Sequence, residues 1–165
     1  TYVIMANHVS FLDVFAIPSV FSGKFTAVAA SKNFKIPVYA TFLKKLKVIS
    51  IDRSNREQSI KGIKQAESLI HNGYHVVILP EGTRTKDGKL QAFKKGGFHL
   101  AINTKAKILP ITTKGLFKIK PINRWTIKPG EIKIKVGEPI DSNNKSVDEL
   151  LLETKNVFNN MIQGM

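Results

Sequence analysis

Cysteine is absent from the 165 residues of this sequence. Its absence excludes disulfides, thiolate metal sites and a cysteine nucleophile within these residues, and it fits a reducing compartment. No apolar run approaches the roughly 18 residues that a membrane-spanning helix needs, and no signal peptide opens the chain. The composition is nevertheless 42% hydrophobic, which is enough for a folded core.

The length and the first residues bear on domain organisation. A chain of 165 residues suits one domain. It begins at Thr1 and enters an apolar strand-like segment at once. We therefore expect residues 1–165 to form a single domain that lacks an N-terminal membrane-associating region.

Acidic residues are scarce. The sequence has 26 Lys and Arg against 12 Asp and Glu, a formal net charge of +14. Such a charge predicts anionic partners, which are nucleic acid, an anionic membrane surface or phosphorylated substrates. Nucleic-acid-binding domains usually carry aromatic stacking platforms or a groove-reading helix within the basic patch, and neither is clear here. A basic nucleic-acid- or membrane-surface-binding domain without catalysis remains the alternative from a different class.

Apolar segments alternate with helical patterns along the chain. Strands are predicted at 1–6, 24–30, 47–53, 74–80, 106–113 and 131–136, and helices at 10–21, 31–46, 54–73, 93–105 and 147–161. Pro37 divides the second helical segment into two short pieces. This alternation predicts an α/β fold with a mixed, largely parallel central sheet flanked by helices.

Three details of this pattern predict specific structural features. Ile132, Ile134 and Val136 alternate with lysines, which predicts a half-exposed strand with these three on one side. An apolar stripe at helical spacing over 147–161 predicts a helix packed onto the sheet. The lysine- and proline-rich stretch 114–130 is expected to be a surface excursion that carries Trp125.

Polar clusters directly follow three of the predicted strands. They are Asn7-His8, Asp52-Arg53 and Glu81–Arg84. Ligands of α/β folds usually bind at the carboxyl edge of the sheet. If these strands are parallel neighbours, the three clusters meet at that edge.

His8 and Asp13 are candidates for a base and its orienting carboxylate. On one continuous helix they would be about 140° apart in azimuth, so they can pair only if His8 lies in a loop and Asp13 in a first helical turn. Asp13 would then accept a hydrogen bond from Nδ1–H and leave Nε2 as the base. The alternative is that Asp13 only faces the helix dipole. We expect Ser10 to be the N-cap of this helix rather than a nucleophile.

Basic side chains near the strand ends suggest phosphate recognition. The guanidinium groups of Arg53 and Arg84 match phosphate oxygens, and Lys32 can add a point charge. Gly82 and Thr83 permit close backbone approach and a donated hydroxyl hydrogen bond. The alternative for each arginine is a surface salt bridge. No spacing of histidines and carboxylates indicates a metal site.

The motifs as a set resemble those of the glycerolipid acyltransferases, and within them the 1-acylglycerol-3-phosphate (lysophosphatidic acid) acyltransferases. The matching residues are Asn7, His8 and Asp13 in Asn-His-x4-Asp, Arg53 at the end of VISIDR, Glu81, Gly82, Thr83 and Arg84 in Glu-Gly-Thr-Arg, and Pro110 in ILPIT. They occur in the family's order and cover nearly the whole chain.

The resemblance implies a fold, a reaction and a place in the cell. His8, held by Asp13, would deprotonate the sn-2 hydroxyl of lysophosphatidic acid, which would attack acyl-CoA or acyl-carrier protein to give phosphatidic acid. Arg53, Arg84 and Lys32 would hold the phosphate, and Glu81 would brace an arginine or bind a glycerol hydroxyl. No metal or other cofactor is implied. The protein would act at the cytoplasmic face of an anionic membrane, without nucleic acid as a partner.

Within the same class, the motifs also fit acylation of glycerol-3-phosphate or of another lysophospholipid. The residues do not discriminate between these acceptors. They also leave open the acyl-chain length and the choice between CoA and carrier protein as donor.

Overall fold

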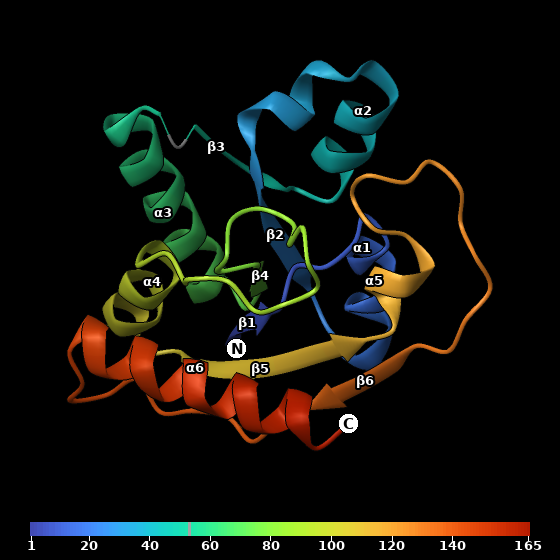
Figure 1. The fold of residues 1–165 in the computed structure, drawn as a ribbon. Coiled ribbons are helices and arrows are strands. Elements are labelled where there is room, and N and C mark those ends of the chain that lie inside the picture. Colours follow the sequence, from blue (N-terminus) through green and yellow to red (C-terminus); the bar gives the residue numbers. More distant parts are fainter. Residues whose placement is uncertain (53) are drawn as a thin grey trace.

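The computed structural model describes residues 1–52 and 54–165. Six strands form one sheet in the order β3-β2-β4-β1-β5-β6 (Figure 1). Their bounds are β1 Tyr2–Ala6, β2 Phe25–Ala30, β3 Ile49–Ile51, β4 His75–Ile78, β5 Lys107–Lys114 and β6 Lys133–Val136. All neighbours run parallel except β5 and β6. The predicted mixed, largely parallel α/β sheet is confirmed.

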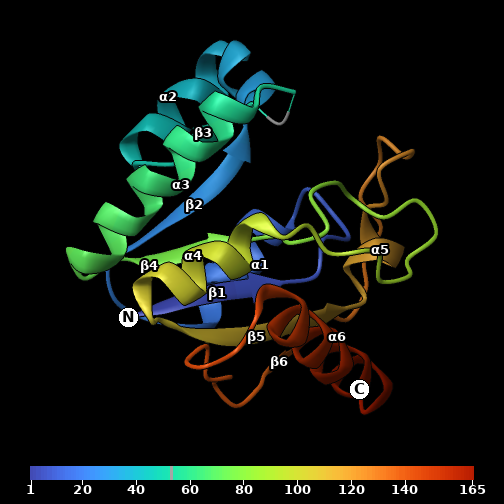
Figure 2. The same ribbon diagram turned by 90° about the vertical axis from the view of Figure 1, so that its left-hand side faces the viewer.

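The helices cover the two faces of this sheet. Their bounds are α1 Asp13–Ala16, α2 Pro37–Lys45, α3 Arg56–His71, α4 Gly96–Thr104, α5 Leu116–Ile119 and α6 Val147–Gln163, with 3-10 turns at Pro18–Val20 and Ser31–Lys35. Figure 2 shows α3, α4 and α6 in front of the sheet and α1 behind it. Within the described ranges, no helix combines the length and the apolarity needed to cross a membrane.

Strand β1 illustrates why the sheet is buried on both faces. Val3 and Met5 join one apolar cluster with residues of α3, α4 and α6, while Ile4 and Ala6 join a second cluster on the opposite face. All four side chains have no exposed surface. Alternate residues of a strand point to opposite faces, so a continuous apolar run is what a central strand of a covered parallel sheet requires.

The register aligns the carboxyl ends of the central strands. Met5 lies opposite both Ile78 of β4 and Pro110 of β5. The residues that follow β1 and β4 therefore emerge next to each other. On the other side, the second half of β2 pairs with β3, and Ala30 lies opposite Ile51.

Most predicted elements are found close to their expected bounds. The predicted division at Pro37 is confirmed, since a 3-10 turn ends before it and α2 begins at it. The stripe on α6 packs onto the sheet, with Leu150, Thr154, Phe158 and Met161 buried. Trp125 is 97% exposed on the predicted surface excursion.

Two predictions about elements are wrong. The helix expected over 10–21 is only four residues long and is followed by a 3-10 turn beginning at Pro18, where the proline interrupts the helical bonding. Strand β6 begins only at Lys133, so Ile132 lies before it, and Ile132 and Val136 do not form an inner face because they are 43% and 45% exposed. This strand is the edge of the sheet, and only Ile134 packs against the core beside Ile111.

Candidate active site

The His8 and Asp13 side chains meet where β1 turns into α1. The distance from His8 Nδ1 to Asp13 Oδ2 is 2.8 Å. The loop after β1 brings the ring back over the first helical turn, which is the arrangement that the spacing required. Asp13 is fully buried, and the imidazole retains 20% of its surface. With Nδ1–H donating to the carboxylate, the lone pair of Nε2 is available to accept a proton.

The carboxylate that orients His8 is itself fixed by the backbone. Asp13 Oδ2 also accepts hydrogen bonds from the N–H groups of Val9 at 2.9 Å and Ser10 at 3.0 Å. Its other oxygen is buried and has no hydrogen-bond partner in the described part of the chain. Three donors on one oxygen leave the carboxylate little rotational freedom, so it can hold the ring in one orientation.

Ser10 has a different role from the expected one. The residue before α1 is Leu12, and no side chain caps the helix, so the prediction of Ser10 as N-cap is wrong. The Ser10 hydroxyl accepts from the N–H of Leu12 at 3.2 Å and donates to the carbonyl of Lys120 at 2.7 Å. The physical reason is that Asp13 draws the preceding N–H groups onto its own carboxylate, which displaces the helix start.

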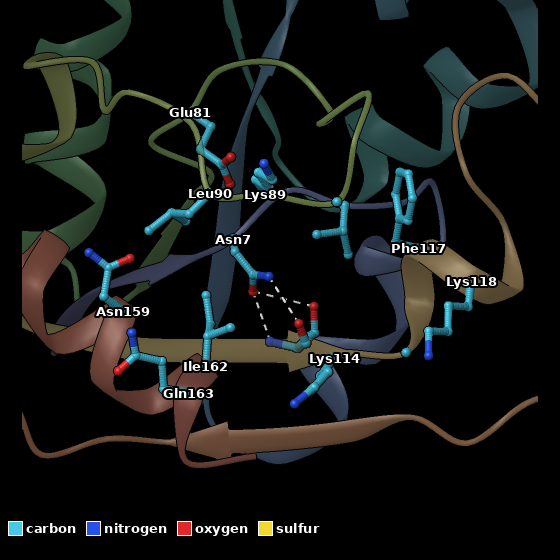
Figure 3. Close-up of a pocket in the computed structure, with 14 residues that line it drawn as sticks. Asn7, Glu81, Lys89, Leu90, Lys114, Phe117, Lys118, Asn159, Ile162 and Gln163 are labelled. Carbon is cyan, nitrogen blue, oxygen red and sulfur yellow. Dashed lines mark hydrogen bonds between the residues drawn. The ribbon is translucent and has the colours of Figure 1, made fainter.

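Asn7 ties the site to strand β5. Its Nδ2 donates to the carbonyl of Thr113 at 3.0 Å, and its Oδ1 accepts from the Thr113 N–H at 2.8 Å and from the hydroxyl at 3.3 Å (Figure 3). Asn7 is buried. The sequence motif contains Asn7 without indicating this partner, although two threonines that end an otherwise apolar strand were a signal for one.

Glu81 positions the backbone of His8. Its Oε1 accepts from the His8 N–H at 2.6 Å, and its Oε2 accepts from the Gln91 N–H at 2.8 Å. The His8 carbonyl in turn accepts from the N–H of Thr85 at 2.9 Å. Burial raises the pKa of the Glu81 carboxyl, and the two backbone hydrogen bonds lower it in part. No ion pair between Glu81 and an arginine occurs among the described residues; its substrate-binding role stays a prediction.

The turn after Glu81 depends on a glycine. Gly82 has φ +77°, a left-handed conformation that favours glycine because it has no Cβ. Its N–H donates to the carbonyl of Leu79 at 3.0 Å. The turn redirects the chain so that Thr83 and Arg84 face the same cavity as His8.

A cavity of about 530 Å³, called here the apolar cavity, opens beside His8. Its polar lining includes His8, Asp13, Lys32, Gly82, Thr83 and Arg84, and its walls are largely apolar and aromatic side chains of β2, β4, α1 and α2. Arg84 lies near Tyr39, whose pKa is raised by burial and lowered in part by the guanidinium charge. The apolar cavity therefore combines a histidine, two cationic side chains and largely apolar walls.

Asp52, the described residue of the remaining polar cluster, does not line this cavity. The Asp52 carboxylate accepts from the N–H of Ser54 at 3.0 Å and from its hydroxyl at 2.6 Å, in the turn before α3. These two hydrogen bonds lower the pKa of Asp52. Arg53 lies outside the described residues, and its expected phosphate contact stays a prediction. Across 1–52 and 54–165, no group of three or more His, Asp or Glu is placed to hold a metal ion.

The chain is thus an α/β domain that has a largely parallel sheet and a His–Asp pair at the carboxyl edge of that sheet. The family described as Acyltransferase matches residues 1–114. A chloroplastic 1-acyl-sn-glycerol-3-phosphate acyltransferase of Arabidopsis thaliana is 32% identical over 147 residues, which cover 88% of this chain and 41% of the relative. A 1-acyl-sn-glycerol-3-phosphate acyltransferase of Saccharomyces cerevisiae is 30% identical and covers 90% of this chain and 50% of the relative.

A solved structure agrees with these relatives. The chain resembles the crystal structure of the 1-acyl-sn-glycerophosphate (LPA) acyltransferase PlsC from Thermotoga maritima, with a TM-score of 0.86 and 28% identity. The similarity covers 99% of this chain and 66% of the other. The chain belongs to the acyltransferase family. It spans half or less of the length of the two curated relatives named above.

Proposed function

We propose that this chain is the catalytic domain of a 1-acylglycerol-3-phosphate O-acyltransferase. It would move a fatty acyl group from acyl-CoA or acyl-carrier protein to the sn-2 hydroxyl of lysophosphatidic acid, giving phosphatidic acid and a free thiol. The observation that supports this most is that the His8–Asp13 pair faces an apolar cavity that also contains Arg84 and Lys32. The names of the similar proteins agree with it.

The chemistry follows from the fixed tautomer of His8. Nε2 removes the proton of the acceptor hydroxyl while the oxygen attacks the thioester carbonyl. The resulting tetrahedral intermediate expels the thiolate, which takes the proton from the imidazolium, so the C–S bond is replaced by a C–O ester bond. Asp13 stabilises the imidazolium between the two steps. A positioned base of this kind is typically worth about 10²- to 10⁴-fold in rate.

The acceptor is an anionic amphiphile, and the apolar cavity suits such a molecule. The guanidinium of Arg84 can bind phosphate oxygens in a bidentate manner, and Lys32 adds a second cation. In the part of the chain that the structure describes, neither is paired with a carboxylate. Gly82 and Thr83 lie beside Arg84; Gly82 has no side chain and permits close approach to the backbone, and Thr83 can donate a hydroxyl hydrogen bond. Arg53 is proposed as a third phosphate ligand on its motif alone.

No cofactor is proposed, because transfer of an acyl group from a thioester to a hydroxyl involves no oxidation or reduction. Most of the acceleration would come from holding two substrates together in the right orientation. The co-substrate is the acyl thioester itself.

An anionic membrane surface is the proposed location, at the cytoplasmic face where anionic lipids are enriched. Exposed apolar side chains occur on α1 and α2 and just before them, and they include Phe11, Phe15, Ile36, Val38 and Phe42. Three of them, Phe11, Ile36 and Phe42, line the apolar cavity. The rings of Phe11 and Phe15 contact each other, and Tyr39 contacts both Phe11 and Phe42, so the aromatic part of the patch is continuous. Exposed lysines lie among them on Ser31–Lys35 and at the end of α2.

The test is an activity matrix on the full-length protein, in which acceptors are crossed with acyl-CoA and acyl-carrier protein. We expect transfer to lysophosphatidic acid, and loss of that transfer in His8→Ala with the circular dichroism spectrum unchanged. His99→Ala, on the exposed face of α4, is the matched control and should retain activity. Transfer only to glycerol-3-phosphate or another lysophospholipid would replace the proposed acceptor, and full activity of His8→Ala would remove His8 from the mechanism.

A further inference from the structure

A second cavity, of about 410 Å³, lies on the other side of the chain segment that carries His8. We call it the basic cavity because Lys89, Lys114 and Lys118 line it together with a single carboxylate, Glu81. Figure 3 shows that these lysines come from three different segments, which are the loop after β4, the end of β5 and α5.

The two cavities share a thin wall. Asn7 and Val9 line the basic cavity, whereas His8 and Ser10 line the apolar one. The second segment divides in the same way, with Glu81 on the basic side and Gly82–Arg84 on the apolar side. His8 therefore stands in a partition between an apolar compartment and a cationic one. In a reaction that joins two substrates at one histidine, each substrate can then bind in a different cavity.

The charge of the basic cavity is not neutralised by the protein. Among the described residues, no ion pair joins Lys89, Lys114 or Lys118 to a carboxylate. The pKa of nearby Asp87 is lowered chiefly by the backbone N–H of Lys89 and only in small part by that lysine's charge. Both oxygens of Glu81 are occupied by backbone N–H groups. The three ammonium groups are thus available to an anionic ligand.

The rest of the lining is not what a bare phosphate ion would need. The side-chain amides of Asn159 and Gln163 on α6 face the cavity, as do the apolar side chains of Leu90, Phe117 and Ile162 (Figure 3). Amides and apolar groups beside lysines suit an elongated ligand that carries amide bonds, methyl groups and a phosphate. Phosphorylated pantetheine has all three.

We propose that the basic cavity binds the phosphopantetheine portion of the acyl thioester donor, an inference that rests on the proposed function. The donor lies with its phosphate among Lys89, Lys114 and Lys118, and its thioester reaches the Nε2 side of His8 at the edge of the partition. The acceptor occupies the apolar cavity with its phosphate at Arg84. The thiol product leaves from the basic cavity after the C–S bond breaks.

The experiment compares the full-length protein with a variant in which Lys89, Lys114 and Lys118 are all replaced by Gln. Three donors are used: acyl-CoA, acyl-carrier protein and acyl-pantetheine, which lacks the phosphate. We expect the KM for the phosphorylated donors to rise about tenfold or more, with kcat and the KM for lysophosphatidic acid little changed. With acyl-pantetheine, the variant and the unmodified protein should behave alike.

A matched control removes the same charge elsewhere. Lys61, Lys64 and Lys105 are exposed and line neither cavity, so their triple replacement by Gln should leave the donor KM unchanged. A larger effect on acyl-CoA than on acyl-carrier protein assigns the lysines to the nucleotide phosphates of CoA, and equal effects assign them to the shared phosphopantetheine. A raised KM for lysophosphatidic acid alone, or an equal effect on acyl-pantetheine, would overturn the proposal.

Binding measured without turnover separates this inference from the proposed reaction. In the His8→Ala background, calorimetric titration with CoA should give a Kd about tenfold weaker when the three lysines are replaced. Lysine-dependent binding of CoA would support the cavity assignment even if no acyl transfer were detected. Binding of CoA that does not depend on these lysines, or no binding at all, would refute it.

Discussion

At the scale of single residues, the site consists of one partly exposed imidazole ring, and hydrogen bonds from buried residues hold both this ring and its backbone. Asp13 holds the ring of His8, and Glu81 and Thr85 hold its backbone on both sides. Of these four residues, His8 keeps a partly exposed ring, whereas Asp13, Glu81 and Thr85 are buried. If His8 is the base, the supporting residues act on the rate through its orientation.

Replacing Asp13 by Asn tests that dependence. The amide can retain some hydrogen bonds but cannot stabilise the imidazolium that forms when His8 takes the proton. We expect kcat to fall by about 10²- to 10⁴-fold, with a small change in the KM for the acceptor, in steady-state assays. Asp148→Asn is the control, since Asp148 is exposed and its ion-pair partner among the described residues is the exposed Lys95. An active Asp13→Asn enzyme would show that the pair is structural.

A second residue makes stability depend on pH. The Nδ1 of His75 accepts from the N–H of Tyr2 at 3.1 Å, and burial lowers the pKa of the imidazole. A lowered folded-state pKa means that the unfolded chain binds the proton more readily, so this contribution is complete above the usual pKa of about 6.5 and is lost as pH falls below it.

We therefore expect the free energy of unfolding, measured by urea titration, to decrease between pH 7.5 and pH 5. His75→Asn, which keeps an acceptor for Tyr2 and does not titrate, should show a smaller decrease. The same variation with pH in both proteins would assign the acid sensitivity to other groups.

The pairing of His8 with Asp13 was predictable because the two residues are only five positions apart, which local geometry constrains. The supports from distant parts of the chain were less predictable, since Glu81 is 73 positions from His8 and Thr113 is 106 positions from Asn7. The lysines of the basic cavity gave no signal in the sequence, because they are three among 26 Lys and Arg residues. The catalytic and binding roles of all these residues stay predictions until they are assayed.

At the scale of elements, buried ones were the easier to predict. Strand β1 and helix α6 are covered by other elements, and their apolar patterns follow directly from that burial. Helix α1 and strand β6 deviate because their surroundings, a buried carboxylate and an open sheet edge, decide their length and exposure. Such surroundings are set by tertiary contacts, about which a local sequence pattern carries no information.

Gly115 joins two elements by a close approach. It has φ +98°, and a Cβ at this position would lie 2.1 Å from the carbonyl oxygen of Glu131. Gly115→Ala should therefore displace α5 from the segment before β6 and lower the free energy of unfolding by about 1–3 kcal/mol. Chemical denaturation measures this change. Gly73→Ala is the comparison, because it has a similar positive φ but no atom within 4 Å; equal losses would mean that only backbone strain matters.

At the scale of the whole molecule, charge and apolar surface are combined. The formal net charge is +14, and the exposed aromatic patch of α1 and α2 borders the apolar cavity. Attraction to an anionic surface is long-ranged and weakened by salt, whereas insertion of apolar side chains is short-ranged. Together they would orient the cavity toward lipid.

Binding to anionic vesicles should depend on this patch. Replacing both Phe15 and Val38 by Ser is expected to weaken partitioning by about tenfold or more, because each large apolar side chain contributes about 1.5–3 kcal/mol when buried. Vesicle sedimentation at two salt concentrations measures it. The control replaces Ile60 and Leu152, which are similarly exposed on α3 and α6.

Equal losses in the two double variants would show that general hydrophobicity, and not this surface, drives binding. Tight, base-dependent binding to DNA or RNA at physiological salt would instead favour the nucleic-acid alternative.

The hydrogen bonds between Asn7 and Thr113 have a consequence for the order in which the protein is made. A chain growing on the ribosome exposes His8 and Asp13 when more than 90 residues still separate it from the strand that receives Asn7. Until β5 has been synthesised and has paired with β1, Asn7 is unsupported and the floor of the site is missing. Translation therefore produces His8 and Asp13 well before the strand that holds Asn7, so the arrangement around His8 can be completed only after β5 has joined the sheet beside β1.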